Sequence, residues 1–252
     1  MVQFRHIIRM IAIHEQLKTL RYAVGHGYAL RRRNFREYGI LIHTTNGKPG
    51  SSFQAEVNYL YNSTDKSIHF IVSKEGKIVQ LLPVTFQAWH AGAVNDPHFD
   101  NHDSIGIELH YAPGEPKKQP ILNSAVKDLI HHLITLYPIF GIETHRAKAV
   151  DSAGKTGRKS DPSHMSDSEF FYWRDAVFNC VFEKKIKKGT ILYTAPEESG
   201  AKAEHITETI GQGFIEKGIL QDDVITSIQY VKNGWVWIPS GIGFFKTSAI
   251  LP

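Results

Sequence analysis

The sequence has almost no cysteine, since Cys180 is the only one among 252 residues. A single cysteine excludes an intramolecular disulfide framework and any zinc site built from several thiolates. Histidine and carboxylate side chains must therefore carry any metal, and the chain has 14 histidines that are candidates for this role.

Long apolar runs are also missing. No stretch approaches the roughly 18 consecutive apolar residues that a membrane-spanning helix requires, so we expect no transmembrane segment. The apolar residues near the N-terminus are interrupted by Arg9 and are not followed by a small-residue cleavage site. We therefore recognise no secretory signal peptide.

Acidic residues are scarce at the start of the chain, where residues 1–36 hold eight Arg and Lys residues and only Glu15 as an acid. Apolar positions between Phe4 and Val24 suit amphipathic helices, so residues 1–36 are predicted to form a basic helical extension. This charge suits an anionic surface, a membrane or nucleic acid. Aromatic residues are not interleaved there as a single-strand platform requires, so we expect no nucleic-acid partner. A solvated helix face before an arginine-rich linker explains the charge equally well.

Strand and helix patterns alternate over the next 150 residues. Short, β-branched apolar runs predict strands, and capping residues followed by apolar positions at helical spacing predict helices. The predicted strands cover residues 38–42, 68–72, 78–82 and 104–109, and the predicted helices begin near Ser51, Asn123 and Ser166.

Composition changes again at the basic segment 184–189. Beyond it lie short apolar runs separated by turn residues, including Asn233-Gly234, a strong signal for a β-hairpin. We predict a small β-barrel module over residues 185–252.

Polar residues with catalytic potential stand at three places. His43 ends the first buried strand, where α/β proteins place ligands. Glu108 is an acid within an apolar strand, which is either an exposed residue of the alternate face or a carboxylate with a raised pKa. His145, Lys159 and Asp161 share one loop region. Hydrolytic zinc takes three such ligands and leaves a fourth position open, but spacing alone does not select them among 14 histidines.

A family resemblance makes that selection. Several blocks in order resemble the zinc-dependent N-acetylmuramoyl-L-alanine amidases, a family that includes phage amidases and peptidoglycan recognition proteins. The blocks are Ile40–Thr45, Ile68–Val72, Gly76–Gln80, Ala88–Gly92, Asn101 with Ser104–Leu109, Thr144-His145 and Gly157–Pro162.

The resemblance implies an α/β fold over residues 37–184, with a mixed central β-sheet flanked by helices and zinc at one end of the sheet. It implies hydrolysis of the amide bond between the lactyl group of N-acetylmuramic acid and the L-alanine of the stem peptide. By position, the zinc ligands are matched by His43, His145 and Asp161, the general base by Glu108, the oxyanion-stabilising cation by Lys159, and substrate-groove residues by Trp89, His90 and Asn101.

An aspartate ligand with Lys159 two residues before it resembles the branch of anhydro-muropeptide amidases, whereas the phage branch has cysteine as this ligand. This chain departs from the family pattern in three places: Ile68 stands where some members carry a catalytic tyrosine, the 146–155 loop is longer than usual, and Ser163 replaces a glycine. We therefore expect a groove of a different shape.

Residues 185–252 resemble a bacterial Src-homology-3-type cell-wall-binding domain, and a β-module that packs on the catalytic domain for structural reasons is the alternative. The alternative function is a non-catalytic protein that recognises peptidoglycan or muropeptides. We expect a protein made in the cytoplasm that acts on the wall after lysis or non-classical export, or on cytoplasmic muropeptides. The sequence makes no prediction of oligomeric state.

Overall fold

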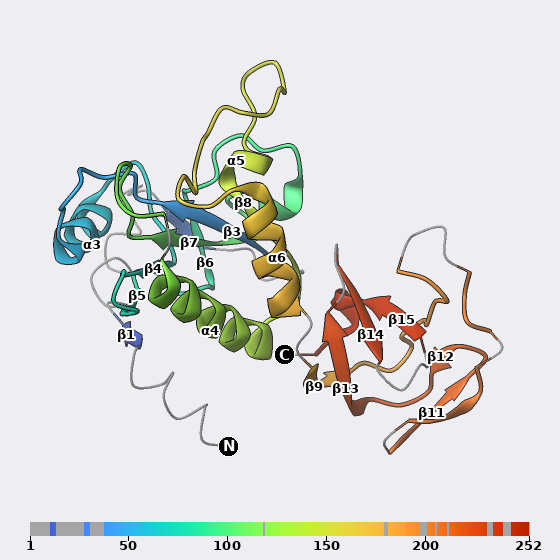
Figure 1. Cartoon of the computed structure of the whole chain (residues 1–252). Coiled ribbons are helices and arrows are strands. Elements are labelled where there is room, and N and C mark those ends of the chain that lie inside the picture. Colours follow the sequence, from blue (N-terminus) through green and yellow to red (C-terminus); the bar gives the residue numbers. More distant parts are fainter. Residues whose placement is uncertain are drawn as a thin grey trace. The chain divides into compact units, whose positions relative to one another are not determined.

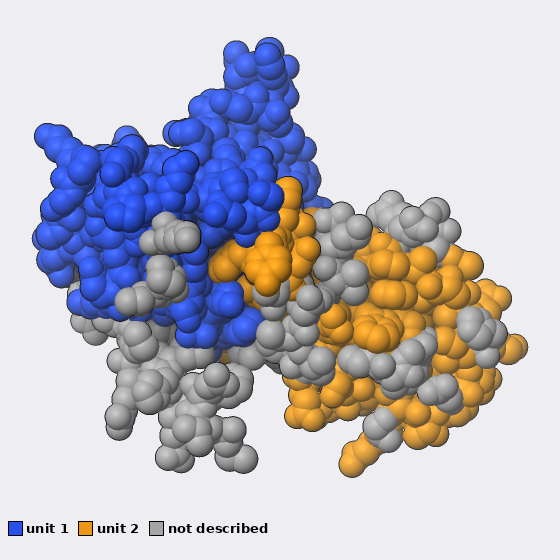
Figure 2. All heavy atoms as spheres, viewed as in Figure 1, with its two compact units in different colours: residues 1–34, 38–132, 142–170 blue, residues 35–37, 133–141, 171–252 orange. Residues whose placement is uncertain are grey.

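The structure, a computed structural model, describes residues 11–13, 28–30, 38–117, 119–178, 181–196, 201–204, 206–210, 212–230, 234–238 and 243–251. The chain divides into two compact units, coloured separately in Figure 2. Unit 1 comprises residues 1–34, 38–132 and 142–170, and unit 2 comprises residues 35–37, 133–141 and 171–252.

A six-stranded mixed sheet has the strand order β1-β5-β4-β7-β3-β8. The strands are β1 (Ile11–Ile13), β3 (Tyr38–Thr44), β4 (Phe70–Val72), β5 (Ile78–Gln80), β7 (Ser104–Leu109) and β8 (Ile139–Thr144). β7 is parallel to both β3 and β4, while β4 and β5 form an antiparallel hairpin. A separate antiparallel pair joins β2 (Tyr28–Leu30) to β6 (Phe86–Ala88).

Strand β3 is buried on both faces, as its continuous apolar run predicts. Ile40 and Leu41 are fully buried and Ile42 is 2% exposed. The predicted strand at residues 104–109 is confirmed, and the predicted hairpin is confirmed with Gly76 at φ 82° in its turn. β3 extends two residues beyond the prediction, so His43 belongs to the strand itself.

Helices flank this sheet (Figure 1). They are α3 (Phe53–Asn62), α4 (Pro120–Leu136), α5 (His145–Lys148) and α6 (Asp167–Phe178), with a 3-10 turn η2 at Pro97–Phe99. α3 packs Val57 and Leu60 against apolar residues of β4 and β5. Within the described part of the chain, no helix is both long enough and apolar enough to cross a membrane.

The two predicted capping boxes have different outcomes. Ser166 and Glu169 exchange side-chain-to-backbone hydrogen bonds at the start of α6, so that box is confirmed. The box predicted at Ser51 is wrong, because Ser52 is the N-cap of α3 and its hydroxyl accepts from the Ala55 N–H. Ser51 and Ser52 are adjacent, and the positions of the buried residues of α3 do not show from sequence which of the two is the N-cap.

The predicted helical extension over residues 1–36 falls mostly outside the described residues. Helix is wrong for Ile11–Ile13, which form β1 and pair with β5 in parallel, and Tyr28–Leu30 also form a strand. The apolar residues near the N-terminus fit the spacing of a helix, but isoleucine also suits a strand, and pairing with β5 decides in favour of the strand at Ile11–Ile13.

The C-terminal part of the chain is rich in strands, as predicted. A four-stranded antiparallel sheet contains, in spatial order, β15 (Gly243–Lys246), β14 (Trp235–Ile238), β13 (Val224–Tyr230) and β9 (Val181–Ile186). A second antiparallel sheet contains β10 (Glu208–Ile210), β11 (Gly213–Glu216) and β12 (Ile219–Leu220), and a 3-10 turn η3 follows at Thr247–Ala249. The antiparallel pairing of β13 with β14 agrees with the Asn-Gly signal, and Gly234 has φ 77°.

Lys184 is a buried cation of strand β9. It is 6% exposed, and burial lowers its pKa to about 8. Between pH 8 and its unfolded value near 10.5, the folded state binds fewer protons than the unfolded state, so stability rises with pH there. Below pH 8 the buried ammonium costs at most about 3 kcal/mol.

We expect Lys184→Met to raise the melting temperature at pH 7 by a few degrees, and this gain to shrink as pH approaches 10.5. Thermal denaturation followed by circular dichroism at both pH values measures it. Lys185→Met is the matched control, because Lys185 is half exposed and its ion pair with Asp223 contributes little. A Lys184→Met variant that melts at or below the wild-type temperature at pH 7 would contradict the expected cost of burial.

Candidate metal centre

Three elements bring His43, His145 and Asp161 together. His43 lies near the carboxyl end of β3, and His145 is the first residue of α5. Thr144 caps this short helix by accepting from the Ala147 N–H, which sets where α5 begins. The loop that follows α5 ends beside the start of this helix, where the Arg146 N–H donates to the Asp161 carbonyl at 2.8 Å. Asp161 is thereby held against the start of α5.

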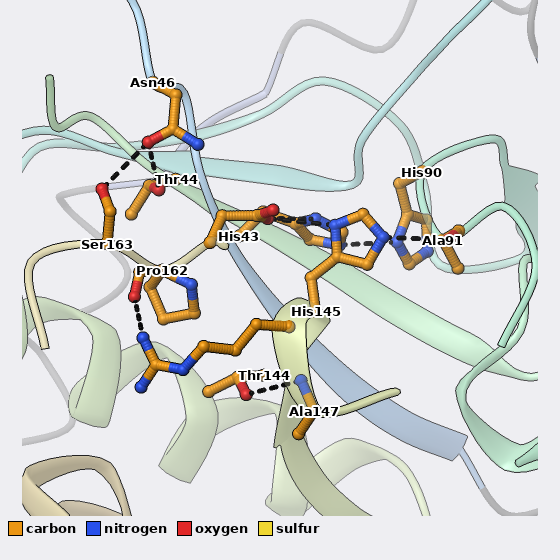
Figure 3. Close-up of polar contacts among 12 residues, drawn as sticks. His43, Thr44, Asn46, His90, Ala91, Thr144, His145, Ala147, Pro162 and Ser163 are labelled. Atoms are coloured by element: carbon orange, nitrogen blue, oxygen red, sulfur yellow. Dashed lines mark hydrogen bonds and ion pairs between the residues drawn. The ribbon is translucent and has the colours of Figure 1, made fainter. Parts of the chain in front are cut away.

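The three side chains converge on one point. Oδ2 of Asp161 lies 3.2 Å from Nδ1 of His43 and 3.0 Å from Nδ1 of His145. The His43 and His145 rings lie 4.4 Å apart between centroids, tilted by 58°. Figure 3 shows these rings side by side with Ala91 and His90 close to them. Within the described residues, they form a His-His-Asp group whose ligand atoms all lie within 4.8 Å of one another.

The donor set fits a tetrahedral metal ion. Two ligand atoms on a tetrahedral zinc, each with a bond of about 2.0 Å, are separated by about 3.3 Å. Both Nδ1–Oδ2 distances are close to that value. The three side chains are 4–6% exposed, so water competes poorly for these ligand atoms.

Burial and mutual contact also set the protonation of this group. Burial, followed by the neighbouring charge of His145, lowers the pKa of His43 to about 4, so its ring is neutral at pH 7. Burial alone would raise the pKa of Asp161, but close contacts of its carboxylate with the His145 and His43 rings hold that pKa well below its usual range. A neutral imidazole and an ionised carboxylate are the forms that bind metals.

Glu108 faces the same side of the sheet as His43. The two residues are directly paired in the parallel register of β3 and β7, and paired residues of neighbouring strands point to one face. Burial, followed by the charges of Asp161 and Glu56, raises the pKa of Glu108 to about 8. Glu108 is thus half-buried on the face of the cluster, and its raised pKa agrees with the second of the two interpretations left open by the sequence.

Lys159 is exposed and stands two residues before Asp161. Its positive charge contributes to lowering the pKa of both His43 and Glu108. Electrostatic influence on both groups indicates a cation near the cluster, and exposure lets this side chain approach a bound molecule.

Two of the three predicted groove residues, Trp89 and His90, are adjacent, and the third, Asn101, hydrogen-bonds to the same segment. Trp89 is half-buried, and its backbone N–H donates to Ser67 Oγ. Nδ1 of His90 lies 2.9 Å from Nε2 of His43. Oδ1 of Asn101 accepts from the backbone N–H groups of His90 and Ala91, at 2.8 and 2.7 Å. The Asn101 side chain therefore holds this segment in place.

Sequence reasoning missed several residues that support the cluster. The Ala91 carbonyl accepts from Nε2 of His145 at 2.9 Å and also from Arg158 at 3.1 Å. Arg158 additionally donates to the Val150 carbonyl and thus ties down the long loop. A backbone carbonyl leaves no signal in a sequence, so only the fold identifies the Ala91 contact.

Asn46 joins the two loops that flank the cluster. Its Oδ1 accepts from the hydroxyls of Thr44 and Ser163, both shown in Figure 3. Asn46 has φ 46°, a left-handed conformation that asparagine tolerates better than most residues. Ser163, which stands where the family has glycine, thus has a partner in this chain.

The fold and the cluster together define the class of this protein: a mixed α/β protein with a buried His-His-Asp group able to hold a metal ion. A family model described as N-acetylmuramoyl-L-alanine amidase matches residues 6–164. Because this match spans more than half of the chain, the chain belongs to that family and is a peptidoglycan amidase. The match begins inside the segment predicted as an extension.

One solved structure supports the fold, and two more are reported as similar to this chain. The structure of PlyL is similar at 22% identity, covering 66% of this chain and 96% of that one, with a TM-score of 0.51. A selenomethionine derivative of AmpD is 23% identical, covering 58% and 89% of the two chains, with a TM-score of 0.49. AmiD from E. coli, in complex with an anhydro-N-acetylmuramic acid peptide, is 25% identical over 52% and 55% of the chains, with a TM-score of 0.42. A comparison with curated proteins found no match.

Proposed function

We propose that this chain is a zinc-dependent N-acetylmuramoyl-L-alanine amidase whose ion is held by His43, His145 and Asp161. It hydrolyses the amide bond between the lactyl group of N-acetylmuramic acid and L-alanine of the stem peptide. The observation that carries the proposal is the convergence of both Nδ1 atoms on Oδ2 of Asp161 at distances suited to a tetrahedral ion. Two neutral rings and one carboxylate leave a bound Zn²⁺ with a net charge of about +1.

When bound, the ion supplies Lewis acidity that polarises the carbonyl and makes water more acidic. The proposed role of Glu108 is general base catalysis, because its side chain shares a face with His43. The positive charge of a bound ion would lower the pKa of Glu108, so that its carboxylate is ionised and can take a proton from the attacking water. The water oxygen bonds to the lactyl carbonyl carbon, the carbon–nitrogen bond breaks, and Glu108 returns the proton to the departing alanine amine. The products are a lactyl carboxylate and a free stem peptide.

Lys159 is proposed to stabilise the negative charge that develops on the carbonyl oxygen. Its ammonium lies close enough to His43 and Glu108 to influence their pKa values. A cation next to a developing oxyanion stabilises the transition state more than the ground state. Trp89 is proposed to contact substrate beside this site.

The alternative is a recognition protein that binds muropeptides without cutting them. A complete set of three ligands favours the enzyme. The half-buried Glu108 carboxylate also favours it, because holding an acid of raised pKa next to Asp161 carries a cost that catalysis would explain. We also propose that residues 185–252 bind the cell wall and that the catalytic part of the chain ends near residue 184.

Product analysis tests the proposed reaction. Incubation of the zinc-loaded protein with intact sacculi, and separately with soluble muropeptides, is expected to release free stem peptides and leave the sugar chains uncut. Mass spectrometry identifies both products, and the ratio of the two rates shows which substrate is preferred. New reducing ends would show glycan cleavage, and binding without any product would favour the recognition protein.

A further inference from the structure

Two adjacent residues, His90 and Ala91, each contact one of the two histidines of the cluster. The His90 ring lies 2.9 Å from Nε2 of His43, and the Ala91 carbonyl lies 2.9 Å from Nε2 of His145. In each histidine this is the ring nitrogen that does not face Asp161. One short segment therefore fixes the orientation of both rings from behind.

A chain of hydrogen bonds leads from a backbone carbonyl to His43. The Asp100 carbonyl can only accept, so the Ser104 hydroxyl donates its single proton there. Towards His90, 3.3 Å away, Ser104 Oγ is then an acceptor, which places the His90 proton on Nε2. A neutral imidazole has one N–H, so Nδ1 of His90 accepts from Nε2–H of His43.

This direction selects one tautomer of His43. With its proton on Nε2, the lone pair of Nδ1 points towards Asp161 and is available to a metal ion. The competing tautomer, with the proton on Nδ1, would donate to Asp161 and would leave Nε2 of His43 and Nδ1 of His90 both as acceptors. With a cation between Nδ1 of His43 and Oδ2 of Asp161, the chain of donors disfavours that tautomer.

We propose that His90 is a positioning residue that holds His43 in its metal-binding tautomer and orientation. The inference rests on the proposed function of the cluster, and it assigns His90 a place behind the ligand and not in the substrate groove. Residues that orient metal-bound histidines in this way typically contribute 10–100-fold to metal affinity or activity.

Packing holds the His90 ring where this role requires it. Gly106 of β7 leaves the necessary room, since a Cβ there would lie 2.8 Å from Cγ and Nδ1 of His90. Asn101 fixes the backbone at the same point through the His90 N–H. The position of the His90 ring is thus set by Gly106 on one side and by the hydrogen bond from its own backbone N–H to Asn101.

Zinc affinity is the direct test, measured on the full chain by competition with a chromophoric chelator. We expect His90→Phe, which keeps a ring but has no acceptor, to weaken zinc binding about 10–100-fold. His90→Asn places an amide oxygen near the position of Nδ1 and is expected to recover most of the affinity. His98→Phe is the matched control and is expected to bind zinc as the wild type does, because the His98 side chain is 40% exposed and contacts Asp96.

Two further measurements separate the possible outcomes. Circular dichroism shows whether each variant folds, and Ser104→Ala, which removes the acceptor behind His90, is expected to weaken zinc binding severalfold. In the zinc-loaded wild type, nitrogen-15 NMR is expected to show the His43 proton on Nε2. Unchanged affinity in folded His90→Phe, or equal losses in the Phe and Asn variants, would overturn the role of His90. A wild-type chain that binds no zinc would instead overturn the proposed function itself.

Discussion

Replacing Asp161 by Ala is expected to remove bound zinc and amidase activity together. In the proposed site Asp161 is the one charged ligand of the three, and its Oδ2 is the atom towards which both Nδ1 atoms point. Without it, two neutral rings remain in a site that is about 95% buried, and the net attraction for a divalent cation falls sharply. We expect kcat/KM to fall by at least about 10³-fold, equivalent to about 4 kcal/mol.

Metal analysis and turnover of the same preparation measure this effect. Asp161→Cys is the informative companion, because a thiolate is also a zinc ligand and should recover part of the bound metal. Asp175→Ala is the control, since that carboxylate is 66% exposed on α6 and forms an ion pair with its neighbour Arg174. If Asp161→Ala keeps zinc and turnover, then Asp161 is not a ligand.

Glu108→Gln is expected to lower kcat by about 10²–10⁴-fold while zinc stays bound. Glutamine keeps the size of the side chain but cannot take a proton from water. The loss should appear in kcat more than in KM, because proton transfer occurs in the transition state. Steady-state kinetics with a soluble muropeptide, together with metal analysis, separates this result from loss of the ion.

Glu56→Gln provides the matched comparison for Glu108. Glu56 lies on α3, and its charge helps to raise the pKa of Glu108. Removing that charge lowers the pKa of Glu108, so the acid side of the pH–rate profile should move to lower pH with kcat nearly unchanged. The positive charge of a bound ion also lowers the pKa of Glu108, and it does so in both the wild type and the Glu56→Gln variant. A Glu108→Gln enzyme with more than a tenth of wild-type kcat would exclude Glu108 as the base.

Local patterns in the chain were sufficient for most elements of unit 1. Periodic apolar residues and turn glycines identified β3, the β4–β5 hairpin, β7 and α4, because these signals act within a few residues. The N-terminal strands escaped this reasoning. β1 and β2 each cover three residues, and each is a strand only because a partner far along the chain, β5 or β6, pairs with it.

The identities of the site residues are contained in the sequence, whereas their arrangement is not. The side-chain types of His43, Glu108, His145 and Asp161 suit the proposed chemistry, and the family resemblance singles these residues out. The parallel register of β3 and β7 decided that Glu108 faces the cluster. Folding also decided that Asn101 clamps a backbone segment and that His90 stands behind His43. The physical reason is distance along the chain: these contacts join residues that are between 10 and 65 positions apart, so no local pattern encodes them.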